Sequence, residues 1–386
     1  MDDQKLLRII RLLYPSARYT ALAPIAAGQM EGEEAEQSFV YVSLYDHKIG
    51  SQTRPIGDKL VIINNTYLSS FAYNVGLCHL VGAAKGMSAG ELARLYRHNF
   101  KKFFAEQVIY ARNVLIGRSL LIETILYEQD LMVSAFAGVV TSGLEEKARQ
   151  IAALASGTVS YHELMHYFEA RDPQFDTRYR TEVGNDFEDI EAEALRLGGA
   201  GLRTEFRCDL AATRVNLDQQ TSFSRADLLR VQLFVFYVLA ELVSLTKSAA
   251  ATAAAAVEEE AYIDLSSAEP PQHAFVFQIG RDPDFDARVD AQEKILARIA
   301  QGEGLTLFGD GAGFPLTSGT RAILQEAQGS IGDIDDTPAQ GLTGTDKLRR
   351  GLAQILSESL KGCDQGVDFL LWRSKKFNLA GDLKFG

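Results

Sequence analysis

Cysteine is scarce in this chain: only Cys78, Cys208 and Cys363 occur among 386 residues, and they lie far apart. Their odd number and wide spacing exclude a disulfide framework and a CxxC metal or redox motif. Such low usage is typical of a reducing compartment, so the sequence predicts a cytoplasmic protein. The first residues, which include Asp2 and Asp3, lack the uninterrupted apolar stretch of a signal peptide.

Long apolar runs and an excess of basic residues are also missing. The nearest approach to a membrane span is 231–245, which is shorter than the roughly 18 residues required and contains Gln232 and Glu241. This run predicts a buried core helix, and we expect no membrane partner. Acidic residues outnumber basic ones by 51 to 39, which gives a net charge of −12. Non-specific binding to a nucleic acid needs clustered Lys and Arg, so we expect no nucleic-acid partner.

What is present is an ordinary globular composition, 46% hydrophobic and 23% charged. Residues 38–46 and 59–64 have the apolar, β-branched character of strands, as does 273–279. Helical patterns fill most of the rest. Their ends are marked by a possible cap at Thr66, by the capping box of Ser88 and Glu91, and by the sequence GGAG at 198–201, which separates an acidic helix over 186–197 from a new helix over 203–218.

These patterns predict an α+β fold that is mostly helical with a small sheet. For a chain of this length we expect two parts. Residues 1–280 would form a catalytic domain with an N-terminal extension, and residues 281–386 an accessory C-terminal region.

The strongest chemical signal is HELMH at 162–166, an HExxH motif. On a helix, the spacing of four places His162 and His166 on one face, where two imidazoles can bind one Zn²⁺. Glu163 would then accept the proton of a water molecule that the metal activates. The flanking apolar residues favour a helix over 145–170, with a possible interruption at Gly157.

A catalytic zinc site needs a third protein ligand. The preferred candidate is Glu205 in EFRCD, because Asp209 follows it by four residues and faces the same way on a helix. One of these carboxylates can bind the metal while the other accepts the N–H of a ligand histidine. Asp172 ranks second and Glu182 third. Cys208, between the two carboxylates, is interpreted as a small buried residue.

HELMH followed by EFRCD resembles the gluzincin metallopeptidases. The resemblance implies a zincin-like fold, His162, His166 and Glu205 as zinc ligands, Glu163 as general base, and Asp209 as the carboxylate behind a ligand histidine. A weaker likeness, carried by VIINNTYLSSFAYNVG at 61–76 and EPPQHAFVFQI at 269–279, is to the phage-exclusion, Lit-type peptidases. In this chain the prolines of the second segment precede His273.

The sequence therefore predicts a soluble zinc-dependent endopeptidase that acts on a protein or peptide. His273 is a candidate catalytic donor to the anionic intermediate of amide hydrolysis. An extended substrate would pair with residues 38–46 as an edge strand. The alternative is a non-catalytic interaction module with a structural zinc site; such a module has no use for Glu163.

Overall fold

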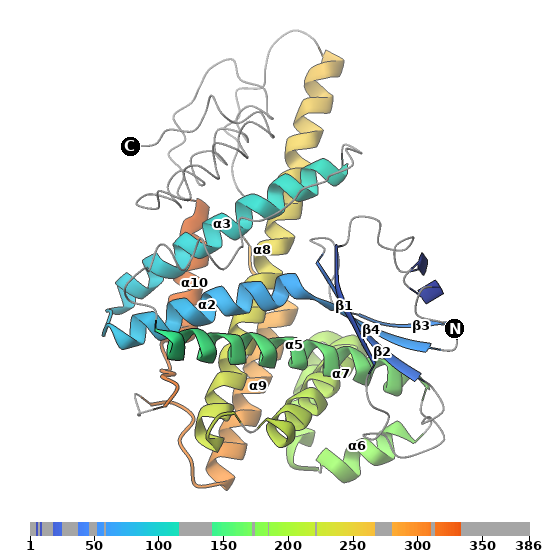
Figure 1. The fold of residues 1–386 in the computed structure, drawn as a ribbon, viewed down its shortest axis with the longest axis vertical. Helices are drawn as coiled ribbons and strands as arrows, with labels where there is room; N and C mark the ends of the chain where they lie inside the picture. The colour runs from blue at the N-terminus through green and yellow to red at the C-terminus, as the bar shows by residue number, and fades with distance from the viewer. Residues whose placement is uncertain are drawn as a thin grey trace. The chain divides into compact units, whose positions relative to one another are not determined.

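The fold is known from a computed structural model. It describes residues 5–6, 8–9, 18–24, 38–45, 52–57, 59–115, 141–171, 174–183, 185–220, 222–266, 280–309 and 313–332. The described part is mostly helical and contains one small sheet, so the predicted α+β class is confirmed (Figure 1).

The chain divides into two compact units. The first comprises Met1–Ala72, Arg149–Leu239 and Pro283–Thr317, and the second comprises Tyr73–Ala148, Ala240–Asp282 and Ser318–Gly386. This division does not follow the boundary predicted at residue 280. Helix α9 (Pro283–Gly302), from the predicted accessory region, belongs to the first unit together with the residues predicted to bind zinc.

The first unit holds a four-stranded sheet in the order β1-β2-β4-β3. Its strands are β1 (Arg18–Pro24), β2 (Ser38–Tyr45), β3 (Gln52–Ile56) and β4 (Lys59–Asn65). Strands β2 and β4 run parallel, with Ser38 opposite Lys59, and the two outer pairs are antiparallel. The strands predicted over 38–46 and 59–64 are confirmed, and the strand predicted over 273–279 lies outside the described residues.

The sequence patterns do not predict the two outer strands, β1 and β3, and they place residues 38–46 at an edge of the sheet. Strand β2 pairs with β1 on one side and with β4 on the other. The expectation that residues 38–46 form an edge strand for a substrate is therefore wrong, because their backbone groups already have partners in the sheet.

The remaining elements of the first unit are helical. They are the start of α2 (Thr66–Ala84, up to Ala72), α5 (Ser142–Arg171, from Arg149 onward), α6 (Phe175–Val183), η3 (Asn185–Phe187), α7 (Glu188–Gln219), the first part of α8 (Arg225–Ser266), and α9. A core cluster joins α6, η3, α7 and α9, and consists of Phe175, Tyr179, Phe187, Ile190, Ala194, Leu202, Phe206, Leu210, Ala291 and Ile295.

Helix α7 contains the break that the sequence predicts. Gly199 has φ 69° and ψ −160°, a conformation that only glycine adopts at little cost, and it divides α7 into two arms. The arms fold back on each other, since Arg203 Nε donates to Glu191 Oε1 at 2.6 Å. The predicted stop at 198–201 is thus confirmed, and the second arm starts on a new course.

The second unit contains most of α2 (Thr66–Ala84), α3 (Ala89–Leu115), the later part of α8, α10 (Thr320–Gly329) and η4 (Ser330–Gly332). The capping box is confirmed: Ser88 N donates to Glu91 Oε2 at 2.8 Å and Glu91 N donates to Ser88 Oγ at 3.4 Å. Helices α3 and α10 pack together.

Helix α8 carries the long apolar run. In the described ranges, Arg225–Ala254 is the one helical stretch with the length and composition to cross a membrane, and most of it is buried inside the protein. The predicted core helix over 231–245 is confirmed, since Gln232 and Glu241 are themselves buried among its apolar residues.

Candidate metal centre

The HELMH motif lies on α5, in the last three turns of a helix that runs through Gly157 without interruption. His162 and His166 project from the same face, one turn apart. Their Nε2 atoms are 2.9 Å apart, and the rings meet edge to face with centroids 4.6 Å apart. The predicted arrangement of the two imidazoles is therefore present, and the expected interruption at Gly157 is wrong.

Gly157 serves instead as the point where α7 approaches α5. A Cβ at this position would lie 3.1 Å from Asn216 Oδ1. Asn216 Nδ2 donates to Thr158 Oγ1 at 2.8 Å, and Gln232 Nε2, from α8, donates to the same oxygen at 3.2 Å. These buried hydrogen bonds fix α5 beside α7 at this point.

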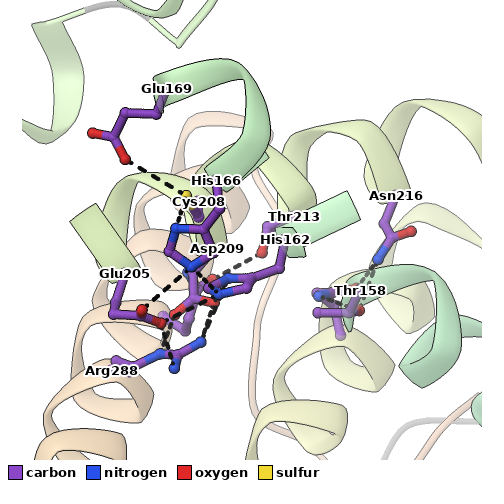
Figure 2. Close-up of polar contacts among 12 residues, drawn as sticks. Thr158, His162, His166, Glu169, Glu205, Cys208, Asp209, Thr213, Asn216 and Arg288 are labelled. Carbon is purple, nitrogen blue, oxygen red and sulfur yellow. Dashed lines mark hydrogen bonds and ion pairs between the residues drawn. The ribbon is translucent and has the colours of Figure 1, made fainter. Parts of the chain in front are cut away.

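Glu205, on the second arm of α7, faces both histidines (Figure 2). Its Oε2 lies 3.2 Å from His162 Nε2 and its Oε1 lies 3.2 Å from His166 Nε2. The structure thus brings together the three residues predicted from sequence to bind the metal, and their ligand atoms all lie within 4.8 Å of one another.

Asp209 lies one turn beyond Glu205, behind His162. Its Oδ1 is 2.7 Å from His162 Nδ1, so Nδ1 carries the proton and donates it to the carboxylate. This hydrogen bond leaves Nε2 as the atom directed towards His166 and Glu205, which is the tautomer that a metal on Nε2 requires. The position predicted for Asp209 is the one observed.

Arg288, on α9, completes the cluster and was missed by the sequence reading. Its Nε and Nη2 donate to the two oxygens of Asp209, both at 2.7 Å, and its Nη1 lies 2.8 Å from Glu205 Oε2. One guanidinium therefore holds both carboxylates in place. No local pattern could have identified it, because Arg288 is 79 residues from Asp209.

The charges within this cluster shift one another's pKa values. Burial opposes the ionisation of Asp209, but the Arg288 guanidinium and His162 hold the pKa of that carboxyl below its usual value. Burial also disfavours a charged His162, yet the Asp209 carboxylate raises the pKa of His162 to about 9. In the metal-free protein His162 is therefore protonated at neutral pH, and a metal ion must displace that proton to bind.

Glu163 lies beside the cluster. Burial raises the pKa of its carboxyl, and the neighbouring histidines His162 and His166 counteract this effect. No hydrogen bond or ion pair joins its carboxylate to another residue in the described ranges. A carboxylate that lies near two imidazoles and whose own pKa is raised has the properties of a general base.

Cys208 occupies the other side of His166. Its Sγ lies 3.5 Å from His166 Nδ1 and 4.0 Å from Glu169 Oε2, and Arg207 Nη1 donates to Glu169 Oε1 at 3.0 Å. Burial, followed by the charge of Glu169, raises the pKa of the Cys208 thiol well above its usual range. The prediction of a small buried residue is confirmed, but its contact with a candidate ligand was not foreseen.

The structure describes no side chain for three of the residues that the sequence analysis considers as ligands or catalytic groups. Asp172 and His273 lie outside the described residues, and for Glu182 the structure describes the backbone alone. The proposed role of His273 and the two lower-ranked ligands therefore stay predictions.

The buried ion pair of Arg288 and Asp209 leads to a prediction about stability. Arg288→Ala should lower the free energy of unfolding of the metal-free protein by about 3 kcal/mol, because removing one partner leaves the other charge buried without compensation. Urea unfolding followed by circular dichroism measures this loss.

Arg298→Ala is the matched control, since Arg298 lies on the same helix but forms an exposed ion pair with Asp189. Its loss should cost less than about 1 kcal/mol. Equal losses in the two variants would contradict the prediction.

Comparison with protein-family models, with curated proteins and with solved structures finds no match for this chain. The assignment of the site therefore rests on its residues and their geometry.

Proposed function

We propose that this chain is a zinc-dependent hydrolase, and most specifically a soluble, cytoplasmic endopeptidase with a gluzincin-type site on a zincin-like fold. The observation that carries the proposal is the meeting of His162, His166 and Glu205. These residues come from two helices and direct three metal-binding groups at one point.

The donor set suits Zn²⁺ in chemistry and in size. Two imidazoles and one carboxylate are a ligand set found in catalytic zinc sites, where bonds of about 2.0–2.2 Å in a tetrahedron separate neighbouring ligand atoms by roughly 3.4 Å. In this chain the two Nε2 atoms are 2.9 Å apart, and each is 3.2 Å from a Glu205 oxygen. These separations lie within about 0.5 Å of the tetrahedral spacing.

His162, His166 and Glu205 would hold a zinc ion with one position open, and the ion would acidify water and polarise a carbonyl oxygen there. The residues of this chain supply the rest. Glu163 takes a proton from the water that attacks the scissile carbonyl carbon, and it then delivers this proton to the leaving amine nitrogen as the C–N bond breaks. Asp209 keeps His162 in the required tautomer, and Arg288 holds Asp209 and Glu205.

The proposed substrate is a protein or peptide, on the strength of the gluzincin resemblance of HELMH and EFRCD. His273 is the proposed additional donor to the anionic intermediate. Glu163 separates this proposal from that of a structural zinc in an interaction module, since such a site needs the ligands but no neighbouring base.

The test is metal analysis combined with a hydrolysis assay. Protein purified in zinc-supplemented buffer should contain about one zinc per chain and should cleave members of a quenched fluorescent peptide library. Phenanthroline should remove the metal and the activity together, and added zinc should restore both. The non-chelating isomer of phenanthroline is the control and should change neither. A chain with one tightly bound zinc and no cleavage in any library would favour the interaction module.

A further inference from the structure

The two candidate histidine ligands are supported from behind by different groups. A carboxylate, Asp209, holds Nδ1 of His162 at 2.7 Å. A thiol, Cys208, faces Nδ1 of His166 at 3.5 Å, a distance at which sulfur forms a hydrogen bond. Both supporting residues are adjacent on the second arm of α7, and both are buried.

The thiol is the middle member of a longer chain of contacts. Its Sγ also lies 4.0 Å from Oε2 of Glu169, which is three residues after His166 on α5. Glu169 is in turn fixed by α7, because Arg207 Nη1 donates to its Oε1 at 3.0 Å and Thr204 Oγ1 donates to the same atom at 3.4 Å. Figure 2 shows Cys208 between His166 and Glu169.

We propose that Cys208 is the positioning residue for His166, linking this ligand to Glu169 through a directed pair of hydrogen bonds. The inference rests on the proposed function. When Nε2 of His166 faces the metal, the ring proton is on Nδ1 and is donated to Cys208 Sγ. The thiol proton is then donated to the Glu169 carboxylate, which can only accept.

The physical effect is to hold the imidazole of His166 in one tautomer and one orientation. A ligand histidine whose second nitrogen is held in this way binds metal more tightly, and loss of such a partner typically weakens binding by about 10- to 100-fold. Sulfur is a weaker acceptor than a carboxylate, so we expect the contribution of Cys208 to be smaller than that of Asp209.

The three residues of this hydrogen-bonded chain also have the groups needed to bind a second metal ion. His166, Glu169 and Cys208 themselves form a group whose ligand atoms lie within 4.8 Å of one another. A second metal ion in this group would have to share His166 with the first and would require its Nδ1 to lose its proton. The hydrogen-bonded chain needs no such change, and it is the arrangement that the geometry favours.

The experiment measures zinc affinity by competition with a chromophoric chelator. Cys208→Ala should bind zinc about 10-fold more weakly than the wild-type chain, and Cys208→Ser, whose hydroxyl both donates and accepts, should lie within about 3-fold of it. Cys78→Ala is the matched control: Cys78 is also a buried free cysteine, but it belongs to the second unit. It should leave zinc affinity unchanged.

A double-mutant cycle tests the link to Glu169. Glu169→Gln replaces the carboxylate, which only accepts, by a neutral amide that is a weaker acceptor, and it should weaken zinc binding by about 3-fold in the wild-type background and not at all in Cys208→Ala. Additive effects would show that Glu169 acts independently of the thiol.

Each result decides for or against the inference. Wild-type affinity in Cys208→Ala overturns the role of Cys208 while leaving the proposed function intact. A wild-type chain that binds no zinc overturns both. Cobalt-substituted protein should lack the near-ultraviolet absorption of a cobalt–thiolate bond; its presence would make Cys208 a ligand and would also overturn the positioning role.

Discussion

Glu163→Gln should retain about one zinc per chain and lose roughly 10²- to 10⁴-fold in kcat for peptide hydrolysis, the usual contribution of a positioned general base. The amide has the size of the carboxylate but cannot accept a proton from water. Glu163 is not among the three metal-binding groups, so its replacement should leave them together. Steady-state kinetics on a cleaved peptide, with metal analysis on the same preparation, measures both quantities.

Glu146→Gln is the control for this variant, because it makes the same isosteric change at an exposed position near the start of α5. It should keep wild-type kcat. Full activity in Glu163→Gln would reject Glu163 as the base, and loss of zinc in this variant would point to a structural role for the carboxylate.

Glu205→Ala should weaken zinc binding by more than about 100-fold, because it removes one of three protein ligands. Asp209→Ala should weaken zinc binding less, by about 10- to 100-fold, because Asp209 orients His162 without reaching the metal. Chelator competition gives both affinities. Because Asp209 is also the partner of Arg288, the folded state of each variant is checked by circular dichroism before the titration.

Asp172→Ala serves as the comparison, since Asp172 is the alternative third ligand that the sequence predicts. It should leave zinc affinity nearly unchanged. The opposite result, with the metal lost in Asp172→Ala and kept in Glu205→Ala, would replace Glu205 by Asp172 and remove the resemblance to gluzincins.

The parts of the candidate site that follow from local spacing could be predicted. His162 and His166 share a helix face because they are four residues apart, and so do Glu205 and Asp209. The glycines at 198–201 mark the point where α7 turns back, so even the placement of Glu205 beside α5 followed from a local signal.

The parts that depend on distant segments could not be predicted. Arg288 lies on α9, whose buried positions include Val289, Ile295 and Leu296 at helical spacing, but no local signal shows that this helix packs beside α7. Its two carboxylate partners, Asp209 and Glu205, are 79 and 83 residues away. The edge strands were missed for a related reason: β3 contains Pro55 and the exposed Arg54, and its identity as a strand comes from its pairing with β4.

The position of Arg288 on α9 also determines when the centre can be completed during synthesis of the chain. A ribosome delivers the chain from its N-terminus at about 5–20 residues per second, so the 79 residues between Asp209 and Arg288 take about 4 to 16 s to emerge. During that interval the chain lacks the guanidinium that holds both carboxylates, and it also lacks Ala291 and Ile295, which belong to the core cluster of the first unit. The nascent chain therefore carries the HELMH sequence for several seconds before Arg288 is available, and the complete cluster forms only in a chain that has been made at least as far as α9.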